Sequence, residues 1–277
     1  MSRMRPAKPS LSEGYDYYPR IESAFQSALD ESLNPRGPEV LYELVAGLGL
    51  RPKADALDLG CGEGRFSIAL AERFGFTLTG IDPVRRNIEV SNQALKDATK
   101  GHSELARLVR FQQGAAEGLP LPDASIDLIW CREVLVLVED LDSAFAECRR
   151  VLRPQGRMLI YQNCRTDRLE PHEAELLGAL GRFDAGRMEA AFSAAGFEAE
   201  EFIELGSEIG ERIEEDTGEA GRRLLHAARL LRDPERYIEQ FGQTAYDIML
   251  GDCLWHVYRM IGKLSGRVYL LRVAEGA

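Results

Sequence analysis

Three glycines stand within five residues in the stretch ALDLGCGEGRF, which runs from 56 to 66. Gly60, Gly62 and Gly64 lie between an apolar run and a helical pattern, where a parallel strand would turn into its helix. Glycine adopts backbone dihedrals closed to other residues and lets a ligand approach the main chain. Asp82 ends the next apolar run, where a carboxylate can accept hydrogen bonds from two ribose hydroxyls. These residues predict a site for a nucleoside-containing cofactor.

Two classes of cofactor compete for such a site. The dinucleotide fingerprint G-x-G-x-x-G requires glycine at position 65, where this chain has Arg65. The spacing is G-x-G-x-G, and no hydride-transfer constellation is recognisable, so a nicotinamide oxidoreductase is disfavoured. A purely structural turn is the other alternative, and the position of Asp82 counts against it.

The elements that must position this site follow from the apolar pattern after Pro52. Short apolar runs alternate with helical patterns, which is typical of a parallel sheet covered on both faces. We expect an α/β fold with a Rossmann-like, doubly wound, mostly parallel seven-stranded sheet. The strands are expected at 56–59, 78–81, 109–112, 126–130, 158–161, 200–205 and 268–273, and the helices between them at 66–74, 87–98, 143–152 and 188–195.

The two ends of the chain differ from this core. Residues 1–14 are polar and expected to be loose, and N-terminal helices are expected at 21–29 and 40–48. A helical insertion is expected between the last two strands. The predicted domains are an N-terminal helical lid segment (1–50), a cofactor-binding core (51–206), a helical cap (207–264) and the last core strand (265–277).

Composition and charge exclude several classes of function. With 34 basic and 45 acidic residues, the net charge of −11 argues against nucleic-acid binding. An arginine-rich stretch at 149–168 is interpreted as a solvated helix end and turn. Five cysteines without a C-x-x-C pair argue against a disulfide framework or a zinc site. The chain shows neither a signal-like apolar start nor a membrane-spanning apolar run, so we expect a soluble, cytoplasmic protein without a membrane partner.

Motifs in the expected core resemble one known family, the class I S-adenosylmethionine-dependent methyltransferases. The resemblance spans roughly 57–162 and includes LDLGCGEG, GIDP at 80–83, GAAEGLPLPDASIDLIWC at 114–131 and RVLRPQGRMLI at 150–160. These elements occur in the family's order and spacing. The resemblance implies S-adenosyl-L-methionine as the cofactor and S-adenosyl-L-homocysteine as the product.

The resemblance also implies roles for individual residues. Asp58 and the glycine loop with Cys61 would line the methionine and adenosyl portions, Asp82 followed by Pro83 would hold the ribose, and Cys131 would lie beside the methionine end. Ala116 would meet adenine through its backbone. Many members have an aspartate where this chain has Ala115, so the bond to the adenine amino group must be absent or come from elsewhere, with Glu117 as the candidate.

Methyl transfer from a sulfonium depends largely on positioning, and a base is needed only if the nucleophile must lose a proton. Glu133, just past the fourth strand, is the first candidate, and its alternative is a helix-capping role. His172 and His256 are weaker candidates that could equally be packing residues. In related enzymes an N-terminal segment covers the cofactor, so Tyr17 or Tyr18 could close the site. The four histidines lack ligand spacing, and we expect no metal.

The predicted function is methyl transfer to an oxygen, nitrogen or carbon atom of a small organic molecule, with natural-product biosynthesis favoured. The cap would enclose the substrate and exclude water. Its apolar positions would equally suit a homodimer or higher homo-oligomer. A protein or RNA substrate is the alternative, and a binding protein without chemistry is a further one.

Overall fold

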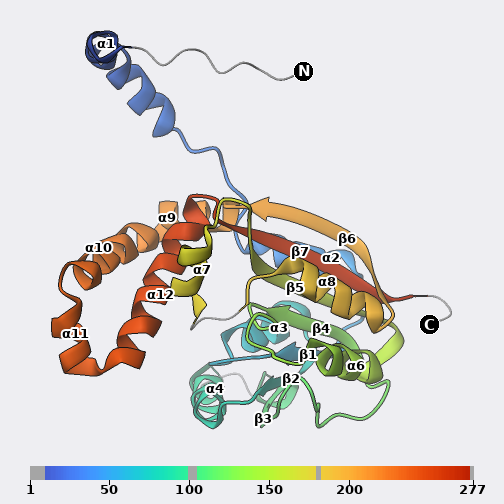
Figure 1. The fold of residues 1–277 in the computed structure, drawn as a ribbon. Coiled ribbons are helices and arrows are strands. Elements are labelled where there is room, and N and C mark those ends of the chain that lie inside the picture. The colour runs from blue at the N-terminus through green and yellow to red at the C-terminus, as the bar shows by residue number, and fades with distance from the viewer. Residues whose placement is uncertain (1–9, 99–104, 179–181, 275–277) are drawn as a thin grey trace. The chain divides into compact units, whose positions relative to one another are not determined.

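The computed structural model describes residues 10–98, 105–178 and 182–274. The chain divides into two compact units, 1–35 and 36–277. In the first unit, helix α1 (Leu11–Leu29) runs through Pro19 and begins ten residues before the predicted start at Ile21 (Figure 1). Residues 11–14, expected to be loose, are therefore helical.

The second unit contains a seven-stranded sheet in the order β3-β2-β1-β4-β5-β7-β6. Only β7 runs against its neighbours, since it pairs antiparallel with both β5 and β6. The parallel strands are rich in buried aliphatic residues, as expected for a sheet covered on both faces. The predicted fold class is confirmed. The strands are β1 (Asp55–Leu59), β2 (Thr77–Asp82), β3 (Val109–Gln113), β4 (Ile126–Arg132), β5 (Leu152–Arg165), β6 (Phe197–Gly206) and β7 (Leu264–Val273).

Helices cover both faces of this sheet. One apolar cluster joins α2 (Glu39–Gly47), α3 (Arg65–Phe74), α4 (Arg85–Ala98) and α5 (Leu105–Leu108) to one face. A second cluster joins α6 (Leu141–Val151) and α8 (Ala185–Ala194) to the other face. The short α7 (Pro171–Leu176) follows β5.

Four helices lie between β6 and β7 and form the cap, shown in orange to red in Figure 1. Gly218, with φ +65°, ends α9, and Gly242 separates α11 from α12. Leu264, the first residue of β7, pairs with Arg165, the last residue of β5. The cap therefore joins the sheet at the carboxyl ends of the parallel strands. Its helices are α9 (Glu208–Thr217), α10 (Glu219–Arg232), α11 (Pro234–Phe241) and α12 (Gln243–Met260).

The arginines at 149–168 do begin at the end of α6, and Arg165 and Arg168 are exposed, but others of the stretch also form ion pairs. Arg153 donates to Asp55 at 2.8 Å and lies 2.6 Å from a carboxylate oxygen of Asp127. Arg157 pairs with Glu200. These ion pairs link segments far apart in the sequence, so the arginines have structural roles. In the part of the chain that the structure describes, no helix has the length and apolarity needed to cross a membrane.

Candidate functional site

The loop after β1 has the backbone that its glycines predict. Gly60, Gly62 and Gly64 all have positive φ, at +71°, +51° and +83°. The amides of Gly60 and Cys61 donate to the carbonyl of Ile81 at 2.8 and 3.0 Å, which attaches the loop to the end of β2. The sequence therefore forms a left-handed loop at the carboxyl end of the sheet, with an arrangement that other residues adopt only with strain.

The glycines differ in what they approach. A Cβ on Gly60 would collide with both methyl groups of Val134, while one on Gly64 would lie 2.5 Å from the Phe111 ring and 2.8 Å from Ser91. Gly62 has open space around it. Gly64 thus lets Phe111 and Ser91 pack closely against the start of α3. Gly60 lets the Val134 side chain, just after β4, lie close to the loop backbone.

Asp82 holds the glycine loop through its carboxylate. Its Oδ2 accepts from the Gly62 amide at 3.0 Å, and its Oδ1 accepts from the Val84 amide at 2.9 Å and the Asn87 side chain at 3.0 Å. A carboxylate has about four acceptor positions, so about one remains for a ligand in this arrangement. Asp82 is thus both a support of the loop and a candidate ribose contact.

A cavity of about 450 Å³ lies at the carboxyl ends of β1, β2 and β4. Its volume falls in the range of about 300–1,000 Å³ typical of small-molecule sites. It brings together residues that are far apart in the sequence and that the sequence predicted for one site. The predicted residues on its lining are Gly60, Asp82, Pro83, Ala115, Ala116, Glu117 and Glu133.

Other predicted cofactor residues do not line this cavity. Asp58 is buried and accepts a hydrogen bond from Ser67 Oγ at 2.5 Å, and burial raises the pKa of its carboxyl to about 6. Cys131 is fully buried in the apolar core, where burial raises its thiol pKa. Cys61, Gly62 and Gly64 are also outside the lining. Tyr17 and Tyr18 belong to α1 in the other unit, and their role stays a prediction.

Glu133 follows β4 in a strained backbone conformation, with φ +59°. Its amide donates to the Tyr161 carbonyl at 2.9 Å. Its carboxylate accepts hydrogen bonds from the side-chain amides of Gln162, at 2.7 Å, and Asn163. Burial raises the pKa of this carboxyl, although the charge of Arg132 opposes the shift. A buried acid of this kind can exchange a proton nearer to neutral pH than a solvated one.

Arg132 contributes a partly buried positive charge to the cavity lining. Its guanidinium lies 4.3 Å from the ring centroid of Phe66 and 5.5 Å from that of Tyr161. Burial lowers its pKa, and its Nε has no hydrogen-bond partner among the described residues. The cavity lining thus includes a cation, which would stabilise the carboxylate of a ligand.

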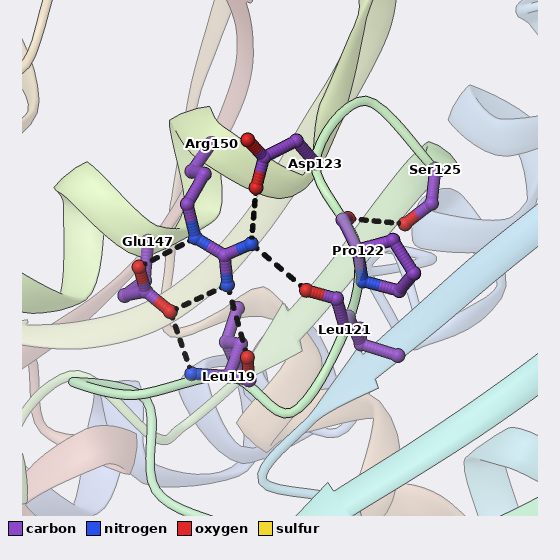
Figure 2. A network of polar contacts seen from close by, with 7 residues as sticks. All are labelled: Leu119, Leu121, Pro122, Asp123, Ser125, Glu147 and Arg150. Atoms are coloured by element: carbon purple, nitrogen blue, oxygen red, sulfur yellow. Dashed lines mark hydrogen bonds and ion pairs between the residues drawn. The ribbon is translucent and has the colours of Figure 1, made fainter.

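Arg150 of α6 binds the segment from Leu119 to Asp123, which directly follows the lining residues Ala115, Ala116 and Glu117 (Figure 2). The Arg150 guanidinium donates to the backbone carbonyls of Leu119 and Leu121 at 2.9 and 2.8 Å. It also bonds both carboxylate oxygens of Glu147 at 2.7 Å and one of Asp123 at 2.6 Å. Glu147 in turn accepts from the Leu119 amide at 2.7 Å. This network anchors the chain just after the lining residues where adenine is expected.

The two candidate histidines do not lie on the cavity lining. His172 is exposed on α7. His256 is buried in α12, with Nε2 3.9 Å from Glu219 and 4.0 Å from Asp252, and burial lowers its pKa. The structure therefore does not place either histidine with Glu133, and their catalytic roles stay predictions.

Several residues of the site were not identified from the sequence. Arg132 and Val134 flank Glu133, Asn87 supports Asp82, and Gln162 and Asn163 bind the Glu133 carboxylate. The Gln-Asn pair ends the apolar run of β5, and polar residues at the carboxyl end of a parallel strand are a signal that could have found them.

Comparison with known proteins identifies the core of the chain. Residues 57–160 match the family described as methyltransferase domain. The chain is 31% identical to methyltransferase GfsG of Streptomyces halstedii, over 53% of this chain and 49% of that protein. It is 28% identical to 27-O-demethylrifamycin SV methyltransferase of Amycolatopsis mediterranei (strain S699), over 56% of this chain and 59% of that protein. The chain thus spans about half the length of these curated relatives in each match.

Solved structures share the fold at low sequence identity. The [4+2]-cyclase SpnF superposes with a TM-score of 0.67 at 19% identity, covering 97% of this chain and 98% of that one. Geranyl diphosphate C-methyltransferase from Streptomyces coelicolor A3(2) superposes with a TM-score of 0.61 at 15% identity, covering 98% and 86%. Residues 57–160 are thus similar to a methyltransferase domain, and the solved structures share the fold that surrounds it.

Proposed function

We propose that this protein binds S-adenosyl-L-methionine in the 450 Å³ cavity and transfers its methyl group to a small organic molecule. The observation that carries the proposal is the left-handed glycine loop, which Asp82 holds at Gly62 and whose Gly60 lines the same cavity as Asp82. A site shaped by bare backbone next to a carboxylate fits a nucleoside better than it fits packing alone.

The residues of this cavity match the parts of the cofactor. Asp82 would accept from the ribose, and Arg132 would pair with the methionine carboxylate. Ala116 would contact adenine, and Glu117, which is exposed on the same loop, would accept from the adenine amino group in place of the missing aspartate. When bound, the cofactor supplies a methyl group already activated by the sulfonium charge, and the protein's part is to orient the acceptor and exclude water.

Glu133 is the best candidate for moving a proton. Gln162 Oε1 and Asn163 Oδ1 are buried acceptors without partners among the described residues. As a carboxylate, Glu133 accepts from the two side-chain amides, as the structure shows. As an acid, it could donate to one of the two free oxygens after the amide turns. Both protonation states can therefore be satisfied, which is what a general base requires.

The acceptor is proposed from the relatives. Two of them carry names that refer to methyl transfer, and 27-O-demethylrifamycin SV is a small natural product by its name. These names favour an acceptor from natural-product biosynthesis, whether it receives the methyl group on oxygen, nitrogen or carbon. The structural likeness to a [4+2]-cyclase shows why the fold alone does not decide the reaction. A protein or RNA acceptor remains the second proposal.

Calorimetric titration with S-adenosyl-L-methionine and S-adenosyl-L-homocysteine tests the cofactor site. Asp82→Ala removes the ribose acceptor and frees the Gly62 amide, so affinity should fall more than tenfold. Asp142→Ala, which removes an exposed carboxylate from α6, should leave affinity unchanged. Unaltered binding by Asp82→Ala would refute the assignment. Release of S-adenosyl-L-homocysteine with small-molecule, protein or RNA acceptors then distinguishes the two proposals.

A further inference from the structure

A second cavity, of about 410 Å³, lies within the cap between α10, α11 and α12. It shares no lining residue with the cavity at the glycine loop. Cys253 and Tyr246 lie deep in the helix packing, at 0% and 9% exposure, while Phe241 and Met249 are 61% and 45% exposed. Part of the lining is therefore buried among the helices, and part is apolar and exposed to solvent.

The sequence of the cap explains why this space is left open. Gly242 ends α11 with φ +87° and turns the chain into α12. Ala245, in the first turn of α12, presents only a methyl group to the cavity. The Tyr246 hydroxyl donates to the Leu230 carbonyl at 3.4 Å, so this polar group is already satisfied. The interior is thus suited to an apolar chain and offers few hydrogen bonds.

Arg229 adds a positive charge to the lining. It is exposed, and in the described ranges it forms neither an ion pair nor a hydrogen bond, although the chain has a net charge of −11. Arg223 of the same helix, by contrast, pairs with Asp252 at 2.7 Å. His226 lines the cavity one turn before Arg229. An apolar cavity with a free guanidinium on its lining is complementary to a molecule with an apolar tail and an anionic head.

We propose that this cap cavity binds an amphiphilic anion, with its apolar chain among α10, α11 and α12 and its carboxylate or phosphate head on Arg229. The volume lies within the range of about 300–1,000 Å³ for small-molecule sites. Burial of the methylenes of the apolar chain favours binding, and a charge-assisted hydrogen bond orients the head. Binding at this site does not depend on methyl transfer, so the two proposals are tested independently.

The full chain is titrated by calorimetry with decanoate, decyl phosphate and decanol, each below its critical micelle concentration. Saturable binding of an anionic probe at least about tenfold tighter than that of decanol is expected, and the tighter of the two anions identifies the head group. Equal affinities for anions and decanol, or no saturable binding, would overturn the proposal. So would sedimentation as a dimer that binds none of the probes, because a second copy would then cover the cavity.

Three variants locate the binding. Arg229→Gln should weaken binding of the preferred anion about tenfold and leave decanol binding unchanged. Arg232→Gln, on the same helix but outside the lining, should change neither. Ala245→Phe should fill the cavity and abolish binding of all three probes. If Ala245→Phe fails to fold by circular dichroism, the comparison of Arg229→Gln with Arg232→Gln still decides, and equal effects of those two would refute the site.

Discussion

At the scale of single residues, the most informative group is the Glu133 carboxyl. Its backbone is held at positive φ, and its carboxylate is bound by two amides rather than by an arginine. Strained, non-glycine residues persist where the surroundings fix them, and they concentrate at functional sites. Because burial raises its pKa above the usual 4.5, this acid can accept a proton closer to neutral pH than a surface glutamate can.

Glu133→Gln should lower kcat by about 10²- to 10⁴-fold if Glu133 is the general base. In the wild type, kcat should rise with pH through the raised pKa of Glu133, because the carboxylate is the active form. The variant should lack that rise, while its affinity for S-adenosyl-L-methionine stays within about twofold. The measurement is kcat against pH with an acceptor that the wild type turns over. Full activity with an unchanged pH profile would make Glu133 structural.

At the scale of elements, a side chain at Gly60 in the loop after β1 would destabilise the protein in two ways, through backbone strain and through a steric clash, and the two can be measured separately. Gly60→Ala introduces a left-handed alanine and a collision with Val134, for a loss of roughly 2–4 kcal/mol in the free energy of unfolding. Gly49 has φ +60° and nothing within 4 Å of its missing Cβ, so Gly49→Ala should cost about 1 kcal/mol. Urea denaturation measures both.

Equal losses of unfolding free energy in the two glycine variants would show that the clash of the added methyl group with Val134 does not affect stability. A double variant adds a direct check, because Val134→Ala should recover part of the stability lost in Gly60→Ala.

The Arg150 network makes a second prediction about an element, the loop from 115 to 121. Arg150→Ala removes hydrogen bonds to two carbonyls and two carboxylates, so the free energy of unfolding should fall by about 2–3 kcal/mol. The loosened loop should also weaken cofactor affinity at Ala116 and Glu117. Arg86→Ala, on the exposed side of α4, should change neither quantity. A variant of Arg150 that is destabilised but binds the cofactor normally would limit the network to stability.

What the sequence could predict at this scale depended on the range of the interactions. Apolar runs and glycines are local signals, and they located the strands and the loop at Gly60. The full length of β5 was not predicted because its end is fixed by the pairing of Arg165 with Leu264, which is distant in the sequence. The Arg150 contacts and the amides of Gln162 and Asn163 at Glu133 likewise join segments about thirty residues apart. Residue types alone do not specify such partners.

At the scale of the whole molecule, the cap joins the sheet at the carboxyl ends of the parallel strands. β7 enters the sheet beside the end of β5, so α9 to α12 are attached where the glycine loop, Asp82 and Glu133 also lie. The cap is attached at this end because β7 is antiparallel to its neighbours. A parallel last strand would begin at the opposite end of the sheet. The insertion point therefore places the helical segment at the same end of the sheet as the cavity.

The division of the chain into 1–35 and 36–277 gives the last prediction. Because the second unit contains the whole sheet and all of its core clusters, deletion of 1–35 should preserve one cooperative thermal transition, with its midpoint shifted by only a few degrees. If Tyr17 and Tyr18 close over the cofactor, the deletion should weaken its binding at least about fivefold by calorimetry. Tyr17→Ala/Tyr18→Ala in the full chain should reproduce that loss. Unchanged affinity in both proteins would disprove the lid, and loss of the transition would show that the first unit is needed for folding.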